Sequence, residues 1–301
     1  MNDTGKFMTR LRVYDESKMD IAESRRAVEY REEGFHFRGK PITVHNTALQ
    51  QLCRLLDIPQ DFFFNTMTPD ERATVFNRLN RHVVDEEKLF RFSGDLLYGI
   101  VSRRYRKLDN VLIADILGAA RGSGLGLKPV KYTFDPDHSR FVFVDDTAEV
   151  GEIAPSITIT NSENGLGSLK ISAGTFRWVC SNGLMTPVGD VARSRWLHKG
   201  NSDVYLPDLF TVLNQSRLHV EQMDTMRGKY LTTSAKTDII LDLAEKLGRR
   251  VAERVIEAAN SEYNGGRTLF DTINAVTRAA QAFRPAEQTE IESYAAGLLA
   301  A

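Results

Sequence analysis

The amino-acid sequence predicts an α+β protein: a central antiparallel sheet with N-terminal helices and a helical C-terminal region. Amphipathic patterns with helix-start signals lie between residues 46 and 79. Short β-prone runs separated by turn residues dominate residues 95–180, and apolar residues at helical spacing dominate the chain after Pro207. The expected domains are a loosely ordered arm, an α+β core domain and a helical C-terminal region, at residues 1–34, 35–205 and 206–301.

The N-terminal third contains two strong local signals after a weakly patterned start. Residues 1–34 are rich in charge and lack periodicity, so they predict a loosely ordered arm. Two β-prone runs within residues 35–44 flank an Arg-Gly-Lys-Pro turn, which is typical of a hairpin. Asn46 is expected to cap a helix that ends before Pro59. A second helix is expected to begin at Thr68-Pro69-Asp70-Glu71, a capping box with proline at the first helical position.

The middle of the chain predicts the sheet. Asp109 is expected to cap a third helix, stopped by the glycine-rich residues 122–124. Strands are expected at Leu96–Ser102, Lys131–Phe134, Arg140–Val144, Ser156–Thr160, Leu169–Ser172 and Thr175–Val179. Ala173-Gly174 is expected to separate the last two. These strands would form an antiparallel sheet built mainly from residues 95–180.

The C-terminal part predicts helices. Apolar residues recur from Ile240 to Val255 along one long amphipathic helix, which Asn264-Gly265-Gly266 ends. A second helix is expected from Leu269 to Phe283 and a short last one from Ile291 to Leu299. No run of about 18 apolar residues is present, so we expect no association with a membrane.

Cysteine and histidine usage favours a soluble protein without a metal. Two cysteines, Cys53 and Cys180, are too few for a disulfide scaffold or a cysteine-based zinc site, which indicates a reducing compartment and a cytoplasmic location. The histidines lack metal-ligand spacing, and the glycine-rich segments at 122–126 and 164–168 favour turns over phosphate loops. We therefore expect no cofactor, no metal and no catalytic residue.

Two basic segments are the most informative feature for function. Residues 97–135 and 168–200 each carry a net charge of +4, although the whole chain has a net charge of −1. A basic groove with interleaved aromatic rings suits single-stranded nucleic acid, because phosphates and base faces are present in every sequence. The expected phosphate contacts are Arg103, Arg104, Arg106, Lys107, Lys170, Arg177 and Arg195, and the expected stacking rings are Tyr105, Trp178 and Trp196.

Three interpretations of the chemistry stay open at this point. Strands of any sheet alternate rings inward and charges outward, so the basic segments are also compatible with a solvated surface. The amphipathic C-terminal helices favour an alternative function in protein interaction or oligomeric assembly. An enzyme that uses Cys180, or an acid and histidine brought together by the fold, is a weaker third alternative, so a non-enzymatic protein is favoured.

Several segments together resemble a known family. They are residues 51–59 followed by Phe62-Phe63, residues 102–110, residues 172–184, of which Ser172-Ala173-Gly174-Thr175-Phe176-Arg177-Trp178-Val179-Cys180 is the most specific part, and residues 274–280. Their order and spacing resemble the phage/plasmid-like proteins of domain-of-unknown-function family 932, from about residue 45 to the end. The resemblance implies a bacterial host cell and a mobile element. It thereby favours a single-stranded DNA-binding accessory protein of replication or recombination.

Overall fold

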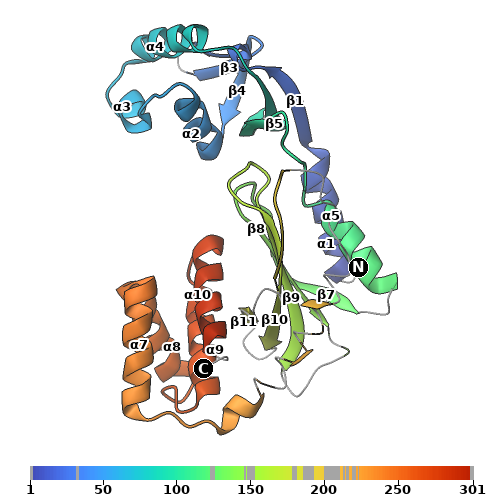
Figure 1. The fold of residues 1–301 in the computed structure, drawn as a ribbon, viewed down its shortest axis with the longest axis vertical. Helices are drawn as coiled ribbons and strands as arrows, with labels where there is room; N and C mark the ends of the chain where they lie inside the picture. Colours follow the sequence, from blue (N-terminus) through green and yellow to red (C-terminus); the bar gives the residue numbers. More distant parts are fainter. Residues whose placement is uncertain are drawn as a thin grey trace.

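The computed structural model describes residues 3–31, 34–122, 126–145, 153–177, 182–185, 193–199 and 224–298, with a few single residues between 147 and 222. In this part of the chain, helices combine with two β-sheets, which confirms the predicted α+β class. The first sheet and its helices form an upper lobe, and the second sheet and the C-terminal helices lie below it (Figure 1). The single sheet predicted from residues 95–180 is therefore two sheets.

The first sheet combines predicted strands with strands from residues 18–31, which the sequence assigned to a loosely ordered arm. Its strand order is β1-β5-β6-β4-β3-β2, and β4 and β6 are parallel while the other neighbours are antiparallel. The strands are β1 Lys18–Ser24, β2 Val28–Arg31, β3 Gly34–Phe37, β4 Lys40–Val44, β5 Glu87–Ser93 and β6 Leu96–Ser102. The predicted hairpin is confirmed as β3 and β4, and the predicted strand at 96–102 is confirmed as β6.

Three helices pack on the first sheet and bury its apolar residues. They are α2 Asn46–Leu55, α3 Gln60–Asn65 and α4 Pro69–His82. The capping box that opens α4 is confirmed, since Thr68 N donates to the Glu71 carboxylate (2.8 Å) and Glu71 N donates to Thr68 Oγ1 (3.4 Å). The N-cap of α2 is His45, one residue before the predicted Asn46.

Residues 3–31 do not form the loosely ordered arm that the sequence predicts. They form helix α1 (Asp3–Glu16) and strands β1 and β2, and Phe7 and Leu11 of α1 are buried against the second sheet. Strand β1 pairs with β5 along its whole length. The sequence signal is weak because α1 buries only these two apolar side chains and β1 lies at the edge of its sheet.

The second sheet is antiparallel and contains several residues of the two basic segments, among them Lys131 on β7, Lys170 on β10 and Arg195 on β12. Its order is β11-β10-β9-β8-β7, and β12 also pairs with β10. The strands are β7 Leu127–Thr133, β8 Ser139–Asp145, β9 Ile153–Asn161, β10 Leu169–Arg177, β11 Asn182–Met185 and β12 Arg193–Trp196. The break predicted at Ala173-Gly174 is absent from β10, because these residues pair with Ile157 and Ser156 of β9.

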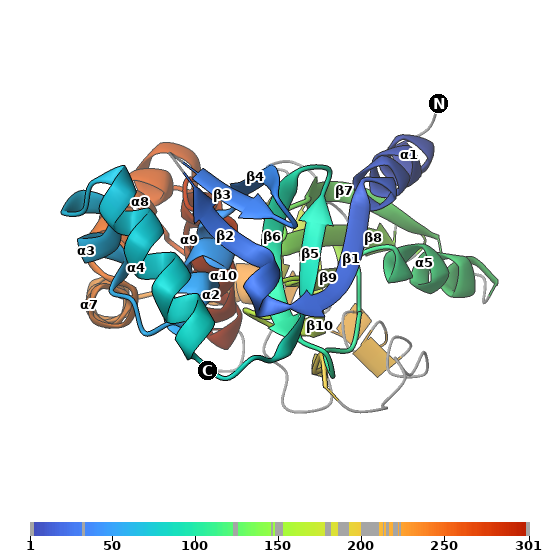
Figure 2. The same ribbon diagram turned by 90° about the horizontal axis from the view of Figure 1, so that it is seen from above.

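The two faces of the second sheet are covered by different helices. One face packs on α1 and α5 (Leu112–Gly122), with Phe141, Ile159 and Ile171 in the shared core. The other face carries Arg140 and Lys170, and the C-terminal helices lie on this side (Figures 1 and 2). The face that holds the polar side chains is thus the one turned toward the helical region.

The C-terminal region is helical, as predicted, but its long helix is broken. Gly248 has φ +93°, a conformation that glycine adopts readily, and it separates α7 (Thr233–Leu247) from α8 (Arg249–Glu262). The 3₁₀-helix η5 (Met226–Gly228) precedes them, and α9 (Leu269–Ala280) and α10 (Pro285–Gly297) follow. Among the described helices, none has the length and apolar character needed to cross a membrane.

Candidate functional site

Residues 161–168, here called the junction segment, join the two sheets. Asn161, Glu163 and Asn164 are buried although they are polar. Gly165 has φ +89°, which agrees with the interpretation of these glycines as turn residues. Gly99 of β6 allows the close approach, because a Cβ atom added there would lie 2.8 Å from Cβ of Asn164. The junction segment is therefore inserted directly against the first sheet.

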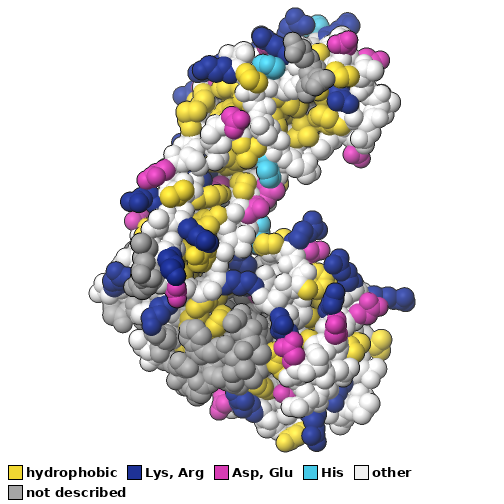
Figure 3. All heavy atoms as spheres, turned by 180° about the vertical axis from the view of Figure 1, so that it is seen from behind, with side chains coloured by type: hydrophobic (Ala, Val, Ile, Leu, Met, Phe, Trp, Pro, Cys, Tyr) yellow, Lys and Arg dark blue, Asp and Glu magenta, His cyan; other side chains and the backbone are white. Residues whose placement is uncertain are grey.

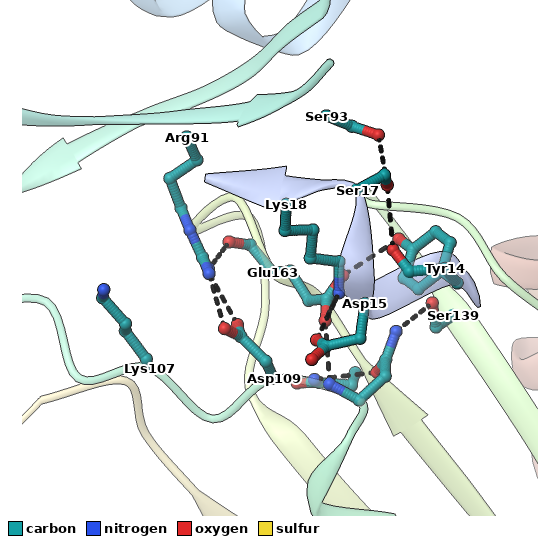
Figure 4. A network of polar contacts seen from close by, with 12 residues as sticks. Tyr14, Asp15, Ser17, Lys18, Arg91, Ser93, Lys107, Asp109, Ser139 and Glu163 are labelled. Atoms are coloured by element: carbon teal, nitrogen blue, oxygen red, sulfur yellow. Dashed lines mark hydrogen bonds and ion pairs between the residues drawn. The ribbon is translucent and has the colours of Figure 1, made fainter. Parts of the chain in front are cut away.

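Glu163 is the centre of the polar contacts at this junction. Its side chain is fully buried, and its carboxylate accepts hydrogen bonds from Tyr14 Oη (2.9 Å), Lys18 Nζ (2.6 Å) and Asn110 N (2.8 Å; Figure 4). These donors come from α1, β1 and the segment before α5. Burial and the neighbouring Glu163 carboxylate raise the pKa of Tyr14 well above its usual range, so its hydroxyl stays protonated and donates.

Arg91 of β5 connects the junction segment to two further carboxylates. Its side chain is 1% exposed. Nη1 donates to the Glu163 carbonyl oxygen, Nε donates to Asp20 (3.0 Å), and Nη2 donates to both oxygens of Asp109 (2.7 Å each; Figure 4). The guanidinium also lies over the ring of Tyr98, 5.6 Å from its centroid. Arg91 therefore holds the first sheet to the segments around the second sheet.

The upper lobe makes a second set of contacts with the lower one through α2. Thr47 Oγ1 donates to Asp137 (2.8 Å), and Gln51 Nε2 donates to the Asn164 carbonyl oxygen (2.8 Å). Gln51 Oε1 accepts from Ile100 N of β6 (2.7 Å). These contacts and the Arg91 network join the lobes, and Figure 3 shows an open hollow between the upper lobe and the lower part of the molecule.

The acidic side chains of the junction are occupied by cations and amides. Within the described residues, no group of three or more His, Cys, Asp or Glu side chains is placed to hold a metal ion. Arg91, Lys18 and the Asn110 amide already satisfy Asp109 and Glu163. The charged groups around Glu163 and Arg91 bind one another. The network is therefore chemically suited to holding the two sheets together.

Within the first basic segment, residues 103–107 are largely engaged in contacts inside the chain. Arg103 is exposed but forms an ion pair with Glu87, and Lys107 Nζ lies 2.7 Å from Asp20 Oδ2. Tyr105 stacks on the ring of His198, with centroids 4.7 Å apart and planes 6° from parallel. Arg104 is exposed and forms no ion pair within the described residues.

The second basic segment places two cations side by side. Lys170 of β10 and Arg195 of β12 are directly opposite in the antiparallel register, and both are exposed. Arg195 Nε donates to Ser168 Oγ (3.0 Å), and no ion pair of either residue is present within the described residues. The predicted Arg177 lies at the end of β10, where the structure describes its backbone alone, and Trp178 lies outside the described residues.

Two of the three predicted stacking rings are part of the protein interior. Trp196 is 7% exposed and lies in the core shared by α1, α5 and the second sheet. Tyr105 is half-buried between His198 and the Arg91 guanidinium, which lies 5.5 Å from its ring centroid. The expectation that these rings are free to stack on bases is corrected, because alternation along β12 turns Trp196 inward while Arg195 points outward.

A row with three cations crosses the second sheet, and two of the three, Lys170 and Arg195, were predicted from the sequence. The row consists of Arg140, Thr160, Lys170 and Arg195, which lie opposite one another on β8, β9, β10 and β12. Arg140 at one end forms a buried ion pair with Glu292 of α10, so the open positive charge lies at the Lys170 and Arg195 end.

The two basic segments meet in space although they are far apart in the sequence. Arg106 N donates to the His198 carbonyl oxygen (3.0 Å), and His198 Nδ1 lies 3.0 Å from the Arg106 carbonyl oxygen. His198 is the second residue after β12. These contacts therefore place residues 103–107 beside the strand that carries Arg195. Burial lowers the pKa of His198, so its ring is neutral in this contact.

A family model described as domain of unknown function DUF932 matches residues 98–298. The match covers two thirds of the chain. The chain belongs to the DUF932 family. Neither a curated protein nor a solved structure matches the chain at a significant level.

The DUF932 match covers the cations of both basic segments and the C-terminal helices. It covers only some of the residues in the polar network around Glu163 and Arg91. Glu163 and Asp109 lie within the match, whereas Tyr14, Lys18 and Arg91 precede it. Its first residue, Tyr98, falls inside strand β6. The boundary of the DUF932 match therefore runs through the first sheet, and the buried charges on the two sides of this boundary depend on each other.

Proposed function

We propose that this DUF932 protein is a non-enzymatic accessory protein that binds the backbone of single-stranded nucleic acid. The observation that supports the proposal is the Lys170–Arg195 pair. Like charges directly opposite on neighbouring strands repel and destabilise a sheet. Neither residue has an acidic partner among the described residues, although acidic residues slightly outnumber basic ones in the whole chain. Phosphates bound by each of the two side chains would remove this repulsion.

In the proposed complex, phosphates are recognised more than bases. Lys170, Arg195 and Arg104 supply exposed cations, whereas Tyr105 and Trp196 are packed in the interior. Affinity would therefore depend strongly on salt, because bound cations are displaced from the nucleic acid. We further propose a role in replication or recombination of a mobile element in the cytoplasm of a bacterial host, a proposal that rests on the sequence resemblance to phage/plasmid-like proteins. We propose single-stranded DNA as the ligand.

The double change Lys170→Ala/Arg195→Ala tests the proposal. Fluorescence anisotropy of a labelled oligonucleotide, single-stranded and duplex, would be measured with nuclease-treated protein at several salt concentrations. We expect weaker binding, and a slope of log affinity against log salt that is smaller by about 1.4, since each phosphate contact on a single strand contributes about 0.7.

The control removes the same charge elsewhere. Lys40 and Arg78 are exposed on the upper lobe, so Lys40→Ala/Arg78→Ala is expected to leave both affinity and slope unchanged. If both double variants lose the same affinity, the effect comes from net charge and not from the Lys170–Arg195 site. Absence of binding by the unchanged protein at low salt would reject the proposal.

A second candidate function is assembly with a partner protein through the C-terminal helices. Leu241 of α7 and Ile256 of α8 are 63% and 43% exposed, and they border a cavity of about 300 Å³ between the two helices. Exposed apolar side chains beside a cavity are typical of contact surfaces. If this surface associates, Leu241→Ser/Ile256→Ser lowers the molecular mass measured in solution by light scattering; a mass equal to one chain for the unchanged protein rejects self-association.

A further inference from the structure

The C-terminal helical unit, residues 226–298, has a hydrophobic core of its own. Every member of this core belongs to η5, to helices α7–α10 or to the segments between them. The sheet face turned toward the unit has a separate small cluster, made of Val142, Val144, Ala154 and Phe176 with Val130 beside it. The two apolar clusters share no member among the described residues. The helical unit therefore has the packing of a separate body placed against the sheet.

The described side-chain contacts between the unit and the sheet are polar. Arg140 of β8 forms an ion pair with Glu292 of α10, and Lys131 of β7 donates to Gln281 after α9. Thr289 of α10 lies 3.5 Å from His138 in the turn between β7 and β8. Strand β11 also lies against α9 and α10. The described contacts are stabilised by charge and hydrogen bonding, so they respond to the ionisation of their members.

Glu292 is the titratable group at the centre of this surface. Its side chain is 0% exposed and that of Arg140 is 4% exposed. Gln288 Nε2 donates to Glu292 Oε1 (3.1 Å), while Nε of Arg140 is buried without a hydrogen-bond partner in the described part of the chain. The Glu292 carboxylate is therefore the group that neutralises the buried charge of Arg140 at this contact.

We propose that the C-terminal helical unit docks on the second sheet through a proton-sensitive contact at Glu292, and that docking tightens as the pH falls from 8 to 6.5. Burial raises the pKa of Glu292 from its ordinary value of 4.5 to about 7, and the attraction of Arg140 offsets only part of this effect. Separation of the unit would return Glu292 to water and to its ordinary pKa. The docked state then binds a proton more tightly than the separated state, so lowering the pH favours docking.

The other charged groups at this contact limit the pH range of the effect. Burial lowers the pKa of His138 below its ordinary value of 6.5, so protonation of this ring in the separated state opposes docking from about pH 7.5 downwards and offsets part of the Glu292 effect. Asp135 and Lys170 act on His138 in opposite directions. Burial and the neighbouring Arg140 also lower the pKa of Lys131, so protonation of this amine opposes docking as well. Between pH 6.5 and 8, Glu292 is the group that titrates most.

Hydroxyl-radical footprinting of the whole protein measures the docking equilibrium, because docking buries side chains, while the backbone hydrogen bonds of β8 with its neighbours and those within α10 stay formed in both states. Oxidation of side chains in residues 139–145 and 285–297 would be followed at pH 6.5 and pH 8, with rates corrected for the effect of pH on the radical yield. We expect the opening equilibrium constant of both segments to be about two- to fourfold larger at pH 8, since linkage to a pKa of about 7 for Glu292 gives about fourfold and His138 offsets at most about half of it. An unchanged or smaller constant at pH 8 overturns the proposal without any variant.

Two variants assign the effect to Glu292. In Glu292→Gln the increase of the opening constant at pH 8 is expected to disappear, because the amide does not titrate. Glu290→Gln is the matched control on the same helix: Glu290 is exposed, and the increase is expected to persist. Persistence of the pH dependence in Glu292→Gln would overturn the assignment to this residue.

Discussion

Replacement of Arg91 by methionine is expected to lower the free energy of unfolding by about 3–5 kcal/mol, since it removes one partner of a buried charge network. Asp109 and the Glu163 carbonyl oxygen would lose the guanidinium donor at a buried site, and Asp20 would keep only Lys107. Urea unfolding followed by circular dichroism would measure the change. Methionine retains most of the aliphatic volume, so the loss reports on the guanidinium rather than on a cavity.

Arg103→Met is the matched control for Arg91. Arg103 also pairs with a carboxylate, that of Glu87, but its side chain is 65% exposed. Exposed ion pairs contribute about 0–1 kcal/mol, so this variant is expected to unfold at nearly the same urea concentration as the unchanged protein. Similar losses for the two variants would contradict the anchoring role of Arg91.

Gly99→Ala is expected to destabilise the protein by about 1–3 kcal/mol through overpacking. The new Cβ would lie 2.8 Å from Cβ and 3.1 Å from Cα of Asn164, so the backbone of the junction segment has to move. Thermal unfolding monitored by calorimetry would measure the loss.

Gly118→Ala is the same chemical change, but it is expected to raise the free energy of unfolding. Gly118 lies inside α5, and a Cβ atom there meets nothing within 4 Å. Alanine in an exposed helix interior is more stable than glycine by about 0.5–1 kcal/mol, so this variant is expected to be stabilised. Stabilisation by Gly99→Ala as well would show that the junction segment adapts without cost.

The parts of the fold that could be predicted have strong local signals. The capping box at Thr68 and the glycine turn after Asn264 fix the ends of helices through contacts between near neighbours in sequence. Strand β6 was predicted with its correct bounds because it is a continuous apolar run. In each case the residues that decide the structure lie within a few positions of it.

The parts that failed depend on distant partners. Strand β1 alternates weakly and becomes a strand because β5, about 70 residues later, pairs with it. Gly248 breaks a regular amphipathic pattern, which a periodicity argument reads as one helix. Ala173-Gly174 continues a strand because β9 supplies hydrogen-bond partners. Tertiary pairing decides these positions, and no local pattern contains it.

The candidate site was predicted in part. Lys170 and Arg195 were named from local charge, and their opposition on neighbouring strands is a tertiary result. Arg91 and Arg140 were missed although a signal was present. Arg91 lies between Phe90 and Phe92, and Arg140 directly precedes the apolar run 141–144, so a solvated charge is not expected at either position. Such a residue indicates a buried partner elsewhere in the chain.

The contacts of Glu163 have a consequence for the order of folding. Lys18 and Tyr14 precede this carboxylate by 145 and 149 residues, so they reach it only after more than half of the chain has been synthesised. Long-range contacts of this kind slow the folding of a domain. The N-terminal strands would leave the ribosome seconds before their charge partner, at synthesis rates of about 5–20 residues per second. The contacts that join the first sheet to Glu163 therefore form only after the loop between β9 and β10 has been synthesised.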